Sequence, residues 1–532
     1  MFRKRRTIAI GCFSLLIVFT GLSTLIGYYS NLPERINQME TIVLGQSRYV
    51  PGSQTVLRVV VRDVSDQAPI AEAAVKVMMQ PPDGGASIPL YEGTTNEHGV
   101  AEASFAVPTD IDAAQNLIVE TSSALGEDRL QQSIKVERDY KILLTTDKPL
   151  YQPGHVIHIR GLALSSFDRE PAAGQAIEFT IADGKGNKVF RDSLVTSTYG
   201  IAAVDFQLAN EVNTGPYKIS AQLGNTVSEK TVTVERYVLP KFKVTLTPEH
   251  SYYLPGEHVQ GNLSAEYFFG KKVTGAEVSI EGFTFDFERQ VLFTLQGVTD
   301  EAGQFTFDFD LPDYIVGTEF EGGAGRFYLQ ASVTDQAQHT EQSSLSLPVS
   351  QSHLIIEAVP ESGRIRAGVE NILYILTSYP DGTPAETRLE VWVDEQVARL
   401  DTGVYGLAAH RFVPSSNWLE LWIGAQDAMG NRSEQSFYFE GIWEEETVLL
   451  RPDHAVYQVG DTMHLDVLTS ASSGVAYLDI VREGQTVSTR TLQITEGLGQ
   501  VAVDLSPDLF GTLELHAYKI LSSGHIVRDT RL

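Results

Sequence analysis

The residues of this chain whose types could take part in chemistry are few and far apart. His155 and His158 resemble a metal-binding pair, but side chains three positions apart on a strand point to opposite faces. The glycine-rich DGKGNK at residues 183–188 lacks the spacing of a phosphate-binding loop, and a hairpin turn explains it. WEEE at residues 443–446 falls at a junction between repeats and is interpreted as a solvated linker rather than a calcium site. We therefore expect no metal, no cofactor and no enzyme activity.

Cysteine content and charge narrow the possible functions further. The only cysteine of the sequence, Cys12, lies in an apolar run, so the chain can form no internal disulfide and no cysteine-based zinc site. With 40 Lys and Arg against 68 Asp and Glu, the net charge is −28, so nucleic acid is not expected as a partner. Asn262-Leu263-Ser264 and Asn431-Arg432-Ser433 fit the N-glycosylation pattern, which matters only in a glycosylating host.

A short turn recurs along the chain. It is written YVPG, YQPG, YLPG, IRAG and YQVG, at intervals of about a hundred residues. Proline presets φ and glycine accepts a positive φ, so the pair suits the two central positions of a type II turn that leads into a strand. The predicted turn residues are Pro51, Gly52, Pro153, Gly154, Pro255, Gly256, Gly368 and Gly460.

A second glycine follows each turn after 38 to 47 residues, at Gly99, Gly200, Gly303, Gly406 and Gly499. Between the two marks the sequence alternates between apolar and polar residues, as in Phe305, Phe307 and Phe309 against Thr306 and Asp308. That period of two is typical of strands with one buried face, and several short strands per repeat predict an antiparallel β-sandwich. The chain is therefore predicted to be all-β, a tandem array of about five sandwiches.

The N-terminus predicts export. A basic tip at residues 1–7 precedes an uncharged run at residues 8–29, which as a helix is long enough to cross a membrane. We expect an uncleaved anchor with its basic end in the cytoplasm, followed by a linker at residues 30–40. The alternative is a cleaved secretory signal, which would make the protein secreted. Both interpretations place the rest of the chain outside the cytoplasm.

Several longer segments carry a family resemblance. TDKPLYQPGHVIHIRGL at residues 146–162, VERYVLPKFKVTLTP at residues 234–248 and AEYFFGKKVTGAEVSI at residues 265–280 resemble the second and third macroglobulin domains of the alpha-2-macroglobulin family. YPDGTPAETRLEVWVD at residues 379–394 and the stretch at residues 457–492 resemble later domains of that family. The resulting macroglobulin-like domains, called modules 1 to 5, are residues 41–137, 138–236, 237–350, 351–444 and 445–532.

The resemblance implies a fold and a role. Macroglobulin domains are seven-stranded, fibronectin-like sandwiches, and full-length members trap proteases with a bait segment and, in many cases, a Cys-Gly-Glu-Gln thioester. This sequence has no such motif, and Cys12 is followed by Phe13. We therefore expect the scaffold part of an endopeptidase inhibitor at the cell envelope, either a fragment or one part of a split system. Its expected partners are proteases, the C-terminal remainder of the inhibitor, and the membrane through residues 8–29.

Two points stay open at the level of sequence. Bacterial adhesion or spacer arrays also use sandwich repeats with Pro-Gly turns, so an extracytoplasmic adhesion array is the alternative function. The modules are expected to follow one another in an open arc rather than to close on themselves.

Overall fold

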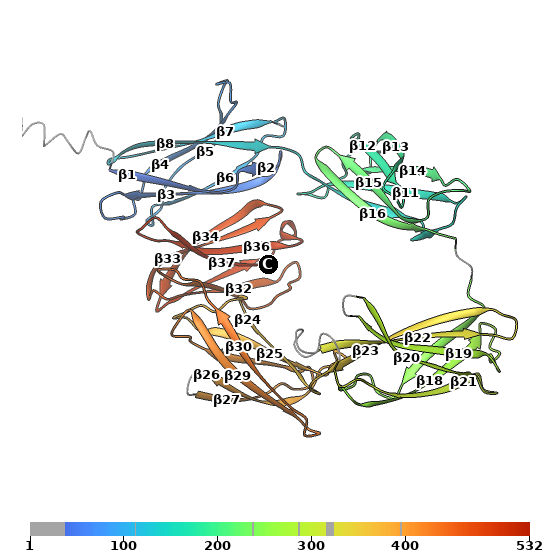
Figure 1. Cartoon of the computed structure of the whole chain (residues 1–532). Coiled ribbons are helices and arrows are strands. Elements are labelled where there is room, and N and C mark those ends of the chain that lie inside the picture. The colour runs from blue at the N-terminus through green and yellow to red at the C-terminus, as the bar shows by residue number, and fades with distance from the viewer. Residues whose placement is uncertain (1–37, 112, 237–238, 286–287, 315–323, 394–395) are drawn as a thin grey trace, which may run out of the picture. The chain divides into compact units, whose positions relative to one another are not determined.

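The computed structural model describes residues 38–532 except residue 112 and residues 237–238, 286–287, 315–323 and 394–395. In this part of the chain there are 37 strands and one 3₁₀ helix, so the all-β prediction is confirmed (Figure 1). No helix among the described residues has the length and apolarity needed to cross a membrane. The basic tip at 1–7 and the anchor or signal predicted at 8–29 lie outside the described residues.

Each module is a sandwich of two antiparallel sheets with one shared strand order. The first, second and fifth of its seven main strands form one sheet, and the other four form the second sheet. Modules 1 and 2 add a two-residue strand, β2 and β10, that runs parallel to the last strand. In module 5 the two sheets are continuous because Thr495 pairs with Leu498 at the β34–β35 hairpin. This topology agrees with the fibronectin-like sandwich that the resemblance implies.

Modules 1 and 2 have the following strands. Module 1 contains β1 (Met39–Leu44), β2 (Arg48–Tyr49), β3 (Gln54–Asp63), β4 (Ala74–Gln80), β5 (Ile88–Thr94), β6 (Val100–Ala106), β7 (Ala114–Ser123) and β8 (Gly126–Val136). Module 2 contains β9 (Tyr140–Thr146), β10 (Leu150–Tyr151), β11 (Val156–Ser165), β12 (Ala176–Ala182), β13 (Lys188–Val195), β14 (Ile201–Gln207), β15 (Gly215–Leu223) and β16 (Thr226–Val234).

The remaining modules have the strands that follow. Module 3 contains β17 (Phe242–Pro248), β18 (His258–Tyr267), β19 (Glu277–Phe285), β20 (Arg289–Val298), β21 (Gln304–Asp310), β22 (Ala324–Thr334) and β23 (Thr340–Ser350). Module 4 contains β24 (Ile355–Pro360), β25 (Asn371–Ser378), β26 (Thr387–Val393), β27 (Gln396–Asp401), β28 (Leu407–Phe412), β29 (Trp418–Asp427) and β30 (Arg432–Glu440). Module 5 contains β31 (Val448–Pro452), β32 (Thr462–Thr469), β33 (Ser473–Arg482), β34 (Gln485–Thr495), β35 (Leu498–Asp504), the 3₁₀ helix η1 (Pro507–Leu509), β36 (Leu513–Ile520) and β37 (Ile526–Arg531).

The alternation seen in the sequence decides which side chains enter each core. In β21, Phe307 and Phe309 are buried while Thr306 and Asp308 are exposed, as the period of two predicts. Each of the five modules has its own cluster of buried apolar residues. The linker is expected to end at residue 40, and this boundary is wrong. Met39 and Glu40 belong to β1, and Met39 is buried in the core of module 1.

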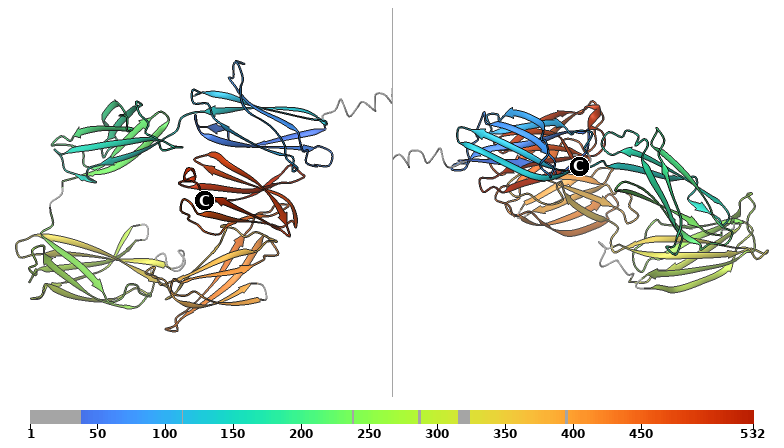
Figure 2. Two further views of the ribbon diagram at one scale, coloured as in Figure 1. Left: turned by 180° about the vertical axis from the view of Figure 1, so that it is seen from behind. Right: turned by 90° about the horizontal axis from the view of Figure 1, so that it is seen from above.

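The modules group into two compact units. Unit 1 consists of the chain up to Arg236, which is modules 1 and 2, together with Val448–Leu532, which is module 5. Unit 2 is Tyr237–Thr447, which is modules 3 and 4. The chain therefore leaves unit 1 after module 2 and returns to it for module 5. Figure 2 shows the strands of module 5 against those of module 1 within unit 1, in both views.

Candidate functional site

The predicted turn residues are structural and lie at equivalent places in five different modules. The turn glycines all have positive φ: Gly52 81°, Gly154 83°, Gly256 76°, Gly368 77° and Gly460 97°. In module 2 the amide of His155 donates to the carbonyl of Gln152 at 3.1 Å, which closes the turn around Pro153 and Gly154. The residue that opens the turn is a core anchor, because Tyr49, Tyr151 and Tyr253 are fully buried. These residues form no common site.

The second glycine mark is a point where two strands approach closely. Gly99, Gly200, Gly303 and Gly406 have positive φ, and a Cβ on each would overlap a carbonyl oxygen of the second main strand of the module. In module 5 the prediction that Gly499 is the second glycine mark is wrong, because Gly499 lies inside β35 and pairs with Val467 of β32. The equivalent residue is Gly497, which has φ 80° and whose carbonyl accepts from the amide of Thr469 at 2.8 Å.

The two histidines considered for metal binding are separated in the structure. His158 lies in β11, and its Nδ1 is 2.7 Å from Oδ1 of Asp205 on the neighbouring strand. His155 precedes β11, and its Nδ1 accepts from the amide of Gln152 at 3.3 Å. Over residues 38–532, leaving out the gaps, no group of three or more His, Cys, Asp or Glu side chains could hold a metal. Asp183 of the DGKGNK stretch accepts from the Asn187 amide at 2.9 Å and closes a hairpin turn.

The contact between modules 1 and 5 is the most highly organised polar site of the described chain. Arg58 on β3 has a fully buried side chain, and its Nη1 lies 2.9 Å from Oδ1 of Asp479 on β33. The same nitrogen donates to the hydroxyl of Tyr518 on β36 at 2.5 Å, and that hydroxyl donates to Oδ2 of Asp479 at 2.9 Å. The guanidinium also lies over the ring of Tyr477, 4.6 Å from its centroid. Arginine, carboxylate and two tyrosines thus form one closed network across the contact.

Burial governs the electrostatics of this network. Burial raises the pKa of Asp479, and the guanidinium of Arg58 offsets part of that rise. Burial also raises the pKa of Tyr518, so its hydroxyl keeps its proton and can donate to Asp479. Apolar side chains surround the network, with Val60 and Val100 of module 1 packed against Tyr477 and Tyr518. A charge enclosed in this way is costly unless paired, so each member of the network depends on the others.

A hairpin of module 5 contacts modules 1 and 2 together. Its turn is Glu483-Gly484, with φ of 49° and 73°, between the paired residues Arg482 and Gln485. Glu483 lies 2.5 Å from Nζ of Lys141 and 2.5 Å from Nη2 of Arg169, both in module 2. Burial opposes ionisation, but the hydrogen bonds from these two cations lower the pKa of Glu483. The hairpin therefore presents an anion to a cationic surface of module 2.

The neighbouring hairpin residues fix the contact with module 1. Nε2 of Gln485 donates to the carbonyl of Arg48 at 3.0 Å, and Oε1 of Gln485 accepts from the amide of Val50 at 3.4 Å. Arg482 lies over the ring of Phe167 of module 2, 4.2 Å from its centroid. We call the contacts of Arg58, Lys141, Arg169, Asp479, Tyr477, Tyr518 and residues 482–486 the junction. The open arc expected from the sequence is wrong in this respect, because module 5 packs on modules 1 and 2.

Sequence reasoning missed the junction, although β3 carries a signal of it. In a strand with one face in solvent, buried and exposed residues should alternate, yet residues 55–62 of β3 are all buried. The sequence QTVLRVVVRD reads as an almost continuous apolar run, which is typical of a strand covered on both faces. Of the two arginines in that stretch, Arg58 pairs with Asp479 of module 5, and Arg62 pairs with Glu40 of module 1. The partner of Arg58 could not be predicted, since it lies more than four hundred positions away along the chain.

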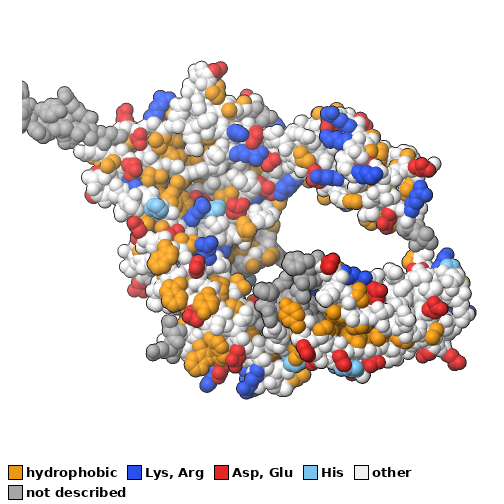
Figure 3. Space-filling model, in the orientation of Figure 1, with side chains coloured by type: hydrophobic (Ala, Val, Ile, Leu, Met, Phe, Trp, Pro, Cys, Tyr) orange, Lys and Arg blue, Asp and Glu red, His pale blue; other side chains and the backbone are white. Residues whose placement is uncertain are grey.

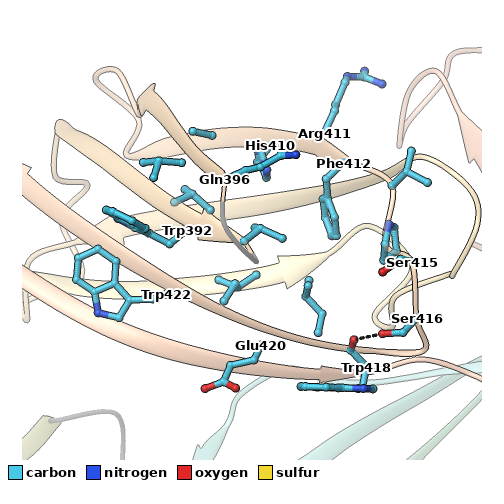
Figure 4. A pocket seen from close by; sticks show the side chains of 18 of the residues that line it. Trp392, Gln396, His410, Arg411, Phe412, Ser415, Ser416, Trp418, Glu420 and Trp422 are labelled. Carbon is cyan, nitrogen blue, oxygen red and sulfur yellow. Dashed lines mark hydrogen bonds between the residues drawn. The ribbon is translucent and has the colours of Figure 1, made fainter.

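Module 4 has an open aromatic groove of about 580 Å³ (Figure 4). All four tryptophans of the sequence lie between residues 392 and 443. Trp392, Trp418 and Trp422 line the groove, and Trp392 and Trp418 are 44% and 58% exposed. Figure 3 shows hydrophobic side chains at the surface over β26, β27 and β29. Such a surface can stack against a ligand.

The polar groups of the groove are not arranged for catalysis. His410 stacks on Phe412, with ring centroids 5.7 Å apart, and burial lowers its pKa. Oγ of Ser416 donates to the carbonyl of Trp418 at 2.7 Å. Among the described lining residues, no hydrogen bond joins His410 to a serine hydroxyl or a carboxylate. The described residues of the groove thus provide an aromatic contact surface.

Comparisons with known proteins agree with this architecture. Residues 141–234 match the MG2 domain, and residues 236–316 match the macroglobulin domain MG3. An alpha-2-macroglobulin of Thermotoga maritima is 28% identical over 42% of this chain, and one of Ralstonia nicotianae is 27% identical over 41%. Ovostatin of Gallus gallus is 29% identical over 35% of the chain. The chain therefore contains two macroglobulin domains. These matches support a relationship to the alpha-2-macroglobulin family.

The chain is similar to only a part of each of these relatives. It covers 14% of the Thermotoga protein and 13% each of the Ralstonia protein and of ovostatin. The crystal structure of trypsin-activated alpha-2-macroglobulin from Escherichia coli aligns with 93% of this chain and 37% of that one. Its TM-score is 0.45 at 13% identity.

Proposed function

We propose that the chain is the scaffold part of an alpha-2-macroglobulin-like endopeptidase inhibitor that acts at the cell envelope. One observation of the fold carries the proposal beyond the family: module 5 packs on modules 1 and 2 through the junction. A spacer or adhesion array needs its modules end to end, whereas here the fifth module packs on the first two. The described residues of the junction and of the groove support a binding role.

The proposal assigns the trapping chemistry to parts that this chain does not contain. The bait and thioester segments lie downstream of the matched domains in the family, and Cys12 cannot form the thioester. The partners of the scaffold are then proteases and the C-terminal remainder of the inhibitor, and the net charge of −28 argues against nucleic acid. The apolar run at residues 8–29 would hold the scaffold on the outer side of the membrane.

The test compares the protein of residues 38–532 with a polypeptide in which bait and thioester domains follow it. Each is mixed with several general proteases, and hydrolysis of a large protein and of a small peptide is measured. We expect the longer polypeptide alone to suppress cleavage of the large substrate, while the small peptide is still hydrolysed. Loss of small-peptide hydrolysis with residues 38–532 would contradict the proposal, because it would mean direct blocking of the protease active site.

The envelope location has its own test. Cells that produce the full chain are fractionated, and intact cells are treated with an added protease. We expect the chain in the membrane fraction and digestible from outside. A chain in the cytoplasmic fraction would contradict the location and leave the trapping test unaffected.

A further inference from the structure

The two sides of the junction are complementary in charge. Modules 1 and 2 contribute the cations Arg58, Lys141 and Arg169, and module 5 contributes the anions Asp479 and Glu483. Module 5 also contributes one cation, Arg482, whose guanidinium lies over the ring of Phe167. In a chain with a net charge of −28, this concentration of cations opposite two carboxylates marks a specific surface. The arginine and the tyrosines at its centre are of the residue types that dominate binding energy in protein interfaces.

The peptide path between the two sides does not pass through the junction. Module 2 ends near Arg236, module 5 begins at Val448, and residues 237–447 connect them as unit 2. Every contact of the junction named above joins residues of unit 1. A cut anywhere in residues 237–447 therefore removes the covalent link and leaves both sides of the junction unchanged.

We propose that modules 1 and 2 form a non-covalent receptor for module 5, which keeps the protein in one piece after its chain is cut in modules 3 and 4. The receptor recognises a β-hairpin that carries Glu483 at its tip and Asp479 four positions earlier, on β33. An extracytoplasmic scaffold exposed to proteases would keep its ends joined when nicked. The receptor does not depend on protease trapping, because it is a property of unit 1 alone.

The binding strength follows from how the groups are enclosed. Arg58 is fully buried, and its Nη2 also donates to the carbonyls of Leu478 at 3.3 Å and Arg490 at 3.0 Å. Module 5 cannot leave without exposing Tyr477 and Tyr518 and separating Arg58 from all of these acceptors. The side chain of Glu483 is 25% exposed, so its ion pairs at the rim adjust specificity and salt dependence more than the total affinity.

The experiment places recognition sequences for a sequence-specific protease after Arg236 and after Trp443, the latter being 80% exposed. The protein of residues 38–532 carries an affinity tag at its N-terminus and is cut at both places at micromolar concentration. We expect the tagged fragment ending at Arg236 to retain the fragment of residues 444–532 on the affinity column. Release of that fragment from the unmodified junction would overturn the proposal.

Three variants assign the retention to the junction. Arg58→Ala should raise the dissociation constant by about tenfold or more, because it leaves Asp479 buried without its partner. Glu483→Lys should weaken retention without unfolding either module, and Lys141→Glu with Arg169→Glu in the same protein should restore it. The matched control is Arg129→Ala, since Arg129 pairs only within module 1, with Glu120 at 3.3 Å. Equal retention in all of these proteins would show that the junction is not the receptor.

Discussion

Two contacts between modules differ sharply in how they are built. At the junction, a buried arginine is held by a carboxylate, a tyrosine and two carbonyls. Between modules 3 and 4, which are neighbours in sequence, Tyr252 stacks on Tyr379 at 6.2 Å and Oγ of Ser251 donates to Asp381 at 2.5 Å. A short linker already keeps modules 3 and 4 at high effective concentration, so a light contact suffices there. Module 5 has no such linker to module 1 and needs a contact that is stable by itself.

The largest expected effect is at the centre of the junction. Arg58→Ala should lower the free energy of unfolding of unit 1 by about 3–5 kcal/mol, because it leaves Asp479 buried and unpaired. Chemical denaturation of residues 38–532 measures this loss, and Arg129→Ala should change it by less than about 0.5 kcal/mol. A loss as small as that of the control would mean that the junction is no stronger than the contact of modules 3 and 4.

A second prediction concerns a glycine inside a module, away from the contacts between modules. Gly406→Ala should lower the free energy of unfolding of module 4 by about 2–4 kcal/mol. The new Cβ would overlap the carbonyl oxygen of Thr377, and the φ of Gly406 is 65°. Gly382→Ala is the matched control: φ is 85° and nothing lies within 4 Å of its Cβ, so only about 1–2 kcal/mol is expected. Calorimetry should show module 4 melting earlier while unit 1 is unchanged. Earlier melting of unit 1 as well would show that the two units unfold together.

The third prediction concerns the loss of stability as the pH falls. The pKa of Glu483 is lowered below its ordinary value of 4.5 in the folded protein, so its contribution to stability is complete above that value and is lost as the pH falls through the lowered pKa. Melting temperatures of the parent and of Glu483→Gln, measured from pH 7 to pH 3, should converge below about pH 4.5. Curves that stay parallel over this range would show that Glu483 is not paired with Lys141 and Arg169.

The smallest effect is expected at the contact of modules 3 and 4. Ser251→Ala removes one hydrogen bond to Asp381, and the loop around Asp381 keeps its bonds from Thr383. The free energy of unfolding of unit 2 should fall by no more than about 1 kcal/mol. A loss comparable to that of Arg58→Ala would remove the distinction between the two contacts.

The sequence predicted what local physics decides and missed what long-range packing decides. Alternation and turn glycines depend on neighbouring residues, and Gly200 and Gly406 recur at a regular spacing after the turns, so five sandwiches could be predicted. The mark at Gly499 failed because Gly497 lies two positions away and only the strand pairing distinguishes them. Arg58 could be recognised as unusual inside its apolar run, but its partner Asp479 belongs to a distant module, and no local pattern connects the two.

The central claim is that modules 1 and 5 are held together through Arg58 and Asp479, and a double-mutant cycle tests it most directly. Arg58→Ala, Asp479→Ala and the double variant are made in the protein of residues 38–532, and the free energy of unfolding of unit 1 is measured by chemical denaturation. Because each single change leaves a buried charge alone and the double change leaves none, we expect a coupling energy of about 2 kcal/mol or more. Additive losses, with a coupling within about 0.5 kcal/mol of zero, would contradict the contact.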